Sequence, residues 1–243
     1  MKKLSVISAL FVLIFLPVGA SAENLVFATS VWPPYVISEN GKASGIDTEI
    51  VLEICRRLKI DPEIQVLPWN RALKHIGDGK ADAGFTARRT AERENIFYYA
   101  SEILHLERTS IFTLKGSNIK AGKLDDLKGK SIGVVRGYSY GPEFDNHKEI
   151  KKIDCDTDED LLRMLDRKRI ELIVGSDEES IKYLSKKVGV EIEMIYIFDA
   201  IPSYIIFSKT LGERGKTLAD KFSEALRQLK QEGFIEKVQS KYF

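Results

Sequence analysis

Short apolar runs alternate along the first half of the chain with longer segments in which apolar residues recur every three or four positions. The runs at 25–28, 64–67 and 81–85 predict buried strands. Asp47 is placed to cap a helix, and Pro68-Trp69 opens a second helical segment. This strand–helix order predicts a parallel sheet covered by helices. The apolar face of the first helix is expected to consist of Ile50, Val51, Ile54, Cys55 and Leu58.

The second half of the chain repeats the same alternation. Apolar runs at 109–114, 131–135 and 170–174 predict three strands. Helical spacing predicts helices at 158–166 and 177–187. This half therefore forms a strand–helix unit of its own.

The last strand and the C-terminal tail return to the first unit. The run at 203–208 predicts a strand that leaves the second unit, and the amphipathic tail at 213–242 then packs on the first. The expected fold class is therefore α/β, with two lobes joined by two crossing strands. We assign residues 23–111 plus 208–243 to lobe 1 and residues 112–207 to lobe 2.

The first 22 residues have the pattern of a secretory signal peptide. Lys2 and Lys3 precede an apolar run at 4–19, and Ala20-Ser21-Ala22 is a small-residue cleavage site. A membrane anchor is the alternative, but a run of about 16 residues that contains Pro17 is short for a span of about 20. We expect export to the periplasm and cleavage after Ala22.

The charge balance weighs against a nucleic-acid partner. The chain has 37 Lys and Arg against 36 Asp and Glu, and removal of the two leader lysines makes it 35 against 36. Proteins that bind nucleic acid normally present a basic face. We therefore expect a small-molecule ligand and no nucleic acid.

The cysteines and histidines show no site pattern. Cys55 lies on an apolar helix face and Cys155 in a polar segment, so we expect two free thiols. A disulfide is the alternative, because exported proteins meet an oxidising environment. His75, His105 and His147 lack metal-ligand spacing, so no metal or cofactor is expected.

The strongest chemical signal is the segment at 83–93. It follows a predicted buried strand and carries Arg88, Arg89 and Arg93 together with Thr86 and Thr90. Arginine presents a planar fork of donors that fits a carboxylate. Open α/β sheets bind ligands at strand ends of this kind. The segment therefore predicts recognition of a small anionic molecule.

Five motifs occur in a distinctive order and spacing: Trp32-Pro33-Pro34-Tyr35, Gly45-Ile46-Asp47, Gly79-Lys80-Ala81-Asp82-Ala83, Thr90-Ala91-Glu92-Arg93 and the segment at 127–134. In these motifs the chain resembles the extracellular solute-binding proteins of family 3, which are the binding components of ABC importers for polar amino acids. The resemblance covers nearly all of residues 24–243. It implies a type II periplasmic binding protein fold, lobes that close on the ligand, a permease partner in the inner membrane, and a monomer.

The resemblance assigns Arg93 as the clamp for the ligand's α-carboxylate. Five residues earlier the family has a hydroxyl or amide, and this chain has Arg88. Two interpretations stay open. Arg88 adds a cationic contact for a more anionic ligand, or it points into solvent while Thr86 and Thr90 support the carboxylate.

The resemblance also places Trp32 and Trp69 against the ligand side chain, where each ring can pack an apolar stem or face a cation. Ordinary packing is the alternative for both. Arg71, which follows Trp69 closely, either faces the cleft or lies in solvent.

In lobe 2 the turn Gly137-Tyr138-Ser139 matches the family's strand-end turn, whose amides and hydroxyl meet the carboxylate. The family's acceptor for the ligand amine is an aspartate after a Val-rich strand. An ungapped count reaches Ser176, and a one-residue bulge would bring in Asp177. The alternative for Asp177 is a helix N-cap.

The leading hypothesis is a periplasmic protein, not an enzyme, that captures an amino-acid-like or carboxylate ligand for an ABC importer. The family also includes a cyclohexadienyl dehydratase, so an enzyme on this scaffold is an alternative, with Asp177 and Glu178 as candidate acids. A sensor that docks on a membrane receptor is the third hypothesis.

Overall fold

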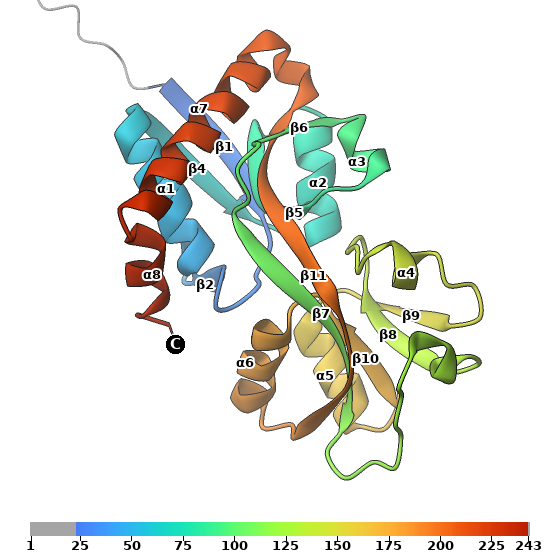
Figure 1. The fold of residues 1–243 in the computed structure, drawn as a ribbon. Coiled ribbons are helices and arrows are strands. Elements are labelled where there is room, and N and C mark those ends of the chain that lie inside the picture. Colours follow the sequence, from blue (N-terminus) through green and yellow to red (C-terminus); the bar gives the residue numbers. More distant parts are fainter. Residues whose placement is uncertain (1–22, 243) are drawn as a thin grey trace, which may run out of the picture.

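The structure is a computed structural model that describes residues 23–242, so the expected leader and its cleavage site lie outside the described residues. Two lobes are joined by two long antiparallel strands, β7 (His105–Leu114) and β11 (Ile192–Ser208), which run side by side from one lobe into the other (Figure 1). The prediction of an α/β fold with two lobes and two crossing strands is confirmed.

One continuous sheet passes through both lobes in the order β4-β1-β5-β11-β7-β10-β8-β9. In each lobe a central strand, β1 or β8, pairs in parallel with both of its neighbours, which the sequence predicted for lobe 1. Lobe 1 contributes β1 (Glu23–Thr29), β4 (Ile60–Val66) and β5 (Ala83–Arg88), and lobe 2 contributes β8 (Ser131–Val135), β9 (Lys151–Cys155) and β10 (Leu172–Gly175). The short strand β6 (Phe97–Tyr99) pairs with β11, and β2 (Ile37–Glu39) pairs with β3 (Lys42–Ser44) in a separate hairpin.

Helices of lobe 1 cover its part of the sheet. The C-terminal tail packs there as predicted, and the Phe222 ring of α7 lies 6.0 Å from the ring of Phe27 in β1 and 5.0 Å from that of Phe207 in β11. The chain turns between the two tail helices at Gly233, in the left-handed region. The helices are α1 (Ile46–Leu58), α2 (Trp69–Gly77), α3 (Ala91–Glu94), α7 (Glu213–Gln231) and α8 (Phe234–Gln239).

Lobe 2 has its own hydrophobic core, in which α5 and α6 pack against β7, β8 and β10 through Phe112, Leu161, Ile173 and Ile181. Separate cores let each lobe move as a body about the crossing strands. The boundaries proposed at 111/112 and 207/208 fall within β7 and β11 and stay a proposal. The helices of lobe 2 are α4 (Pro142–Asp145), α5 (Asp158–Asp166) and α6 (Glu178–Val188), with a 3-10 turn at Leu124–Leu127. A second 3-10 turn, at Lys209–Leu211, lies in lobe 1.

Three local predictions can be compared with the structure. The capping role of Asp47 was wrong, because α1 begins at Ile46 after Gly45 and the Asp47 carboxylate turns inward. The strand predicted at 81–85 extends to Arg88, which makes Arg88 a strand residue. Cys55 and Cys155 are free and buried, as predicted.

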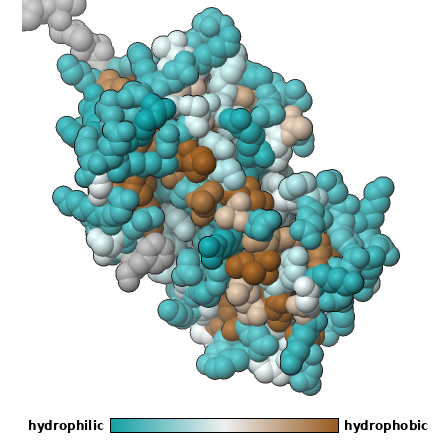
Figure 2. Space-filling model, in the orientation of Figure 1, coloured by the Kyte–Doolittle hydropathy of each residue, from teal (hydrophilic) through white to brown (hydrophobic). Residues whose placement is uncertain are grey.

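The outer surface in the orientation of Figure 2 is mostly hydrophilic, and hydrophobic residues gather toward the junction of the two lobes. No helix within residues 23–242 combines the length and apolar character needed to cross a membrane.

The loop at 32–36 is anchored to the start of α1. The amides of Ile46 and Asp47 donate to the carbonyls of Pro34 and Tyr35, at 3.1 and 3.0 Å. Gly45 makes this approach possible, because its φ is +106° and a Cβ there would lie 2.5 Å from the Tyr35 carbonyl oxygen. Only glycine adopts this conformation without strain.

We expect Gly45→Ala to lower the free energy of unfolding by about 2–4 kcal/mol, because strain adds to a backbone clash. Urea denaturation measures the loss. Gly41→Ala is the matched control, since Gly41 also has positive φ (+78°) but a methyl group added there would meet no atom within 4 Å, and it should cost about 1 kcal/mol. Equal losses in the two variants would contradict the role assigned to the close approach.

Candidate functional site

A small cavity lies between the two lobes, where the carboxyl ends of β1, β5, β8 and β10 meet. Strand ends of an open α/β sheet are the expected place for a ligand. Eight of the ten site residues predicted from the sequence line it, and Thr90 and Asp177 do not. The lining residues are Ser30, Trp32, Trp69, Thr86, Arg88, Arg93, Glu107, Tyr138, Ser139 and Ser176.

Arg93 reaches into this cavity from α3, where Thr90 is the N-cap and accepts from the Arg93 amide. Its guanidinium donates to the carbonyls of Arg88 (3.0 Å) and of Gly137 in lobe 2 (2.7 Å), and it lies 5.7 Å from the Trp69 ring. Burial lowers the pKa of Arg93. Within residues 23–242, no carboxylate oxygen lies within 4 Å of its guanidinium nitrogens. Arg93 is thus a buried cation held by neutral acceptors.

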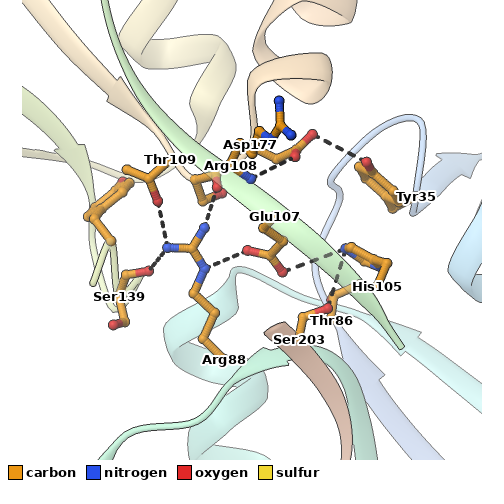
Figure 3. Close-up of polar contacts among 12 residues, drawn as sticks. Tyr35, Thr86, Arg88, His105, Glu107, Arg108, Thr109, Ser139, Asp177 and Ser203 are labelled. Carbon is orange, nitrogen blue, oxygen red and sulfur yellow. Dashed lines mark hydrogen bonds and ion pairs between the residues drawn. The ribbon is translucent and has the colours of Figure 1, made fainter. Parts of the chain in front are cut away.

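Arg88 lies beside it in a different environment (Figure 3). Its Nε donates to the Glu107 carboxylate at 2.6 Å, and both side chains are under 5% exposed. Its Nη1 donates to Thr109 Oγ1 (2.7 Å) and to the Ser139 carbonyl (2.8 Å), and its Nη2 donates to the Ser176 carbonyl. The interpretation that Arg88 points into solvent is therefore wrong.

Sequence reasoning missed a cluster of polar residues on β7. Glu107 pairs with Arg88, and His105 Nδ1 lies 3.2 Å from the buried Asp47 carboxylate. The imidazole also stacks on the ring of Tyr35, with 4.4 Å between centroids. Burial lowers the pKa of His105, but the carboxylates of Asp47, Glu107 and Asp177 outweigh it and raise the pKa.

A signal for this cluster is present in the sequence. His105, Glu107 and Thr109 occupy alternate positions of a strand whose continuation is apolar, and alternate residues of a strand face the same side. Three polar side chains on one buried face indicate a site. Within residues 23–242 no three His, Cys, Asp or Glu side chains gather in an arrangement that could hold a metal ion.

Asp177 is the N-cap of α6, as the alternative interpretation held. Its Oδ1 accepts from the amides of Glu179 and Ser180, each at 3.1 Å, and its Oδ2 accepts from the Arg108 amide at 3.3 Å. The Tyr35 hydroxyl of lobe 1 also donates to Oδ1, at 3.3 Å (Figure 3). Asp177 thus contacts the opposite lobe, whereas the neighbouring Ser176 lines the cavity.

The turn after β8 presents carbonyl oxygens to both buried arginines. Its hydroxyl groups face other partners: Ser139 Oγ donates to Asp145 at 2.7 Å, and the Tyr138 hydroxyl donates to Asp158 at 3.3 Å. Amide and hydroxyl contacts from this turn to a carboxylate stay a prediction.

The remaining candidates are spread around the cavity. Trp32 stacks on Tyr35 with 4.6 Å between ring centroids, and Thr86 Oγ1 donates to the Phe85 carbonyl. Arg71 is exposed and outside the lining, which favours the interpretation that it lies in solvent. Arg89 is exposed, as expected, and lies over the Tyr99 and Tyr204 rings.

Comparison with known proteins agrees with this geometry. The family model of the bacterial extracellular solute-binding proteins, family 3, matches residues 25–243. The chain belongs to this family. It is thus a solute-binding protein, and its fold suits ligand capture between lobes.

Curated relatives match nearly the whole chain in sequence, and a solved structure matches it in fold. It is 25% identical to the "Probable amino-acid-binding protein YxeM" of Bacillus subtilis (strain 168), with 94% of this chain and 83% of the relative covered. It is 25% identical to the "ABC transporter arginine-binding protein 1" of Escherichia coli (strain K12), with 100% and 99% covered. A crystal structure of a mutant ArgBP from T. maritima superposes with a TM-score of 0.79 at 22% identity, over 90% of this chain and 95% of that one.

The buried Asp158 beside Tyr138 makes stability depend on pH. Burial raises the pKa of Asp158 to about 7, and the carboxylate of Asp177 adds to this, against the hydrogen bond from Tyr138. Because the unfolded value is about 4, the folded chain holds a proton there that the unfolded chain releases between pH 4 and 7. The contribution of Asp158 to the free energy of unfolding is therefore lost as pH rises from 4 to 7.

We expect the free energy of unfolding of Asp158→Asn, relative to that of the wild type, to rise by about 2–3 kcal/mol from pH 5 to pH 8. The reason is that the wild-type carboxyl group ionises in this range and the amide does not. Urea denaturation at both pH values measures the gain. Asp166→Asn, at an exposed position in the same helix, is the control and should show no such gain. A difference between wild type and Asp158→Asn that does not change with pH would refute the assignment.

Proposed function

We propose that this protein captures a small amino acid or related carboxylate in the cavity between its lobes and delivers it to an ABC importer. The observation that carries the proposal is Arg93, a buried cation between the lobes whose acceptors are carbonyl oxygens. A carboxylate would give this guanidinium a charged, bidentate partner. Several relatives are named as amino-acid-binding proteins, which supports the same ligand class.

The surroundings of Arg93 suit a ligand that is part charged and part apolar. Trp69 lies beneath the guanidinium, and Trp32 forms another part of the lining. Ligand pockets commonly combine aromatic walls with a few placed polar groups. We infer that the carboxylate meets Arg93 and that the rest of the ligand packs against these rings.

The cellular setting follows from the proposed ligand capture. The leader predicted at 1–22 would direct the chain to the periplasm, with cleavage after Ala22. The proposed partner is the inner-membrane permease of an ABC importer, and the proposed state in solution is a monomer.

Arg93→Ala should weaken binding of the carboxylate ligand at least about 30-fold, because it removes a buried, charge-assisted contact. Isothermal titration of the purified protein against the proteinogenic amino acids and small organic acids identifies the ligand. The same titration of the variant then measures the loss.

Two matched variants make this test specific. Arg93→Lys keeps the charge but loses the planar fork, so its affinity should fall between those of the wild type and Arg93→Ala. Arg71→Ala removes an exposed arginine of lobe 1 and should leave affinity unchanged. Saturable binding that survives Arg93→Ala intact would show that the clamp lies elsewhere.

A further inference from the structure

Four hydrogen-bond acceptors form a cage around the Arg88 guanidinium. They are the Glu107 carboxylate, the Thr109 hydroxyl and the carbonyls of Ser139 and Ser176. Together they accept from all three nitrogens of the guanidinium. The cage thus consists of one carboxylate and three neutral oxygens, all of which accept hydrogen bonds. Such a set of acceptors recognises a cation with several N–H groups.

The acceptors of the cage come from the crossing strand and from lobe 2, and the guanidinium that they hold comes from lobe 1. Glu107 and Thr109 lie on the crossing strand β7, and Arg88 extends toward them from β5 (Figure 3). Ser139 and Ser176 belong to lobe 2. The Arg88 side chain therefore bridges the lobes in the way that a captured ligand bridges them. It lines the same cavity as Arg93, which donates to the Arg88 carbonyl.

We propose that Arg88 is a tethered occupant of a guanidinium-binding subsite and thereby sets the ligand class. The proposal rests on the proposed function. Because the chain's own guanidinium fills the subsite and neutralises Glu107, the ligand itself carries a carboxylate for Arg93 and no extended cationic side chain. This excludes arginine-like ligands and selects small ligands that are anionic or have a short neutral side chain.

Burial and charge distinguish this subsite from a surface ion pair. Arg88 and Glu107 are 4% and 2% exposed, so a Glu107 carboxylate without Arg88 would be a buried charge whose remaining cationic neighbour is His105, with its Nε2 3.7 Å away. Removal of the Arg88 side chain leaves a cage that favours a free cation of the same shape. The neighbouring Arg89 has no such cage, because its side chain is exposed over two tyrosine rings.

The test is a gain of binding in Arg88→Ala. Calorimetric titration with ethylguanidinium chloride should give binding at least tenfold tighter for Arg88→Ala than for the wild type. L-arginine should show the same gain. Thermal unfolding supplies a second readout: ethylguanidinium should raise the Tm of Arg88→Ala by several degrees over sodium chloride at the same concentration, and should not raise that of the wild type.

Three variants separate a specific subsite from a general effect. The double variant Arg88→Ala with Glu107→Gln should lose the response, because the cage then lacks its charge. Arg89→Ala should behave as the wild type. Arg88→Val keeps the first carbons of the buried stem and leaves the space beyond Cγ for the shorter methylguanidinium, so it should gain methylguanidinium binding even if Arg88→Ala folds poorly.

Failure of the subsite proposal can be distinguished from failure of the proposed function, because ethylguanidinium has no carboxylate and its binding does not depend on Arg93. No gain of binding over the wild type in either Arg88 variant, with ethylguanidinium for Arg88→Ala and methylguanidinium for Arg88→Val, would overturn the subsite, as would a response that persists in the Glu107→Gln double variant. Wild-type binding of L-arginine as tight as that of any other amino acid would overturn the assigned ligand class. If neither Arg88 variant folds alone, a refolding yield no higher in ethylguanidinium than in sodium chloride would also overturn the proposal.

Discussion

The relation of the two lobes depends on how the buried guanidinium groups of Arg88 and Arg93 are satisfied. Both originate in lobe 1, and both donate to backbone carbonyls of lobe 2. A buried charge is costly unless its donors are paired. Separation of the lobes would remove these carbonyl partners and would have to replace them with water. The arginines thus couple lobe position to the state of the cavity.

The crossing strand β7 gives this coupling a fixed base. Glu107 and Thr109 hold the Arg88 guanidinium from a strand that belongs to both lobes, so this part of its environment does not require lobe 2 to be in place. The same strand carries His105, which stacks on Tyr35, and the Tyr35 hydroxyl contacts Asp177. Each lobe has its own core, which allows motion to concentrate at the crossing strands while the contacts of Glu107 and Thr109 with Arg88 stay in place.

The sequence predicted the architecture because periodicity and strand order are local properties. The parallel runs, the returning strand and the amphipathic tail are readable without knowledge of tertiary contacts. Arg88 shows the limit of what such local patterns can predict. Its position marked a departure from the family, but its burial depends on Glu107, a residue 19 positions away on another strand. The capping assignment of Asp47 failed for the same reason, since the carboxylate pairs with His105 from outside its own helix.

The different partners of the two arginines show how one cavity can both hold its lobes together and respond to a ligand. Arg88 has a carboxylate partner, so its charge is already compensated and a ligand has little to offer it. Arg93 donates to carbonyls, and a ligand carboxylate would improve its electrostatic environment only where the lobes enclose both groups. A ligand shifts a conformational equilibrium by its difference in affinity between the states, so this improvement favours closure. In the proposed mode of binding, the compensated Arg88 contributes equally with or without ligand, so Arg93 determines the affinity for the ligand and Arg88 limits the shape of the cavity.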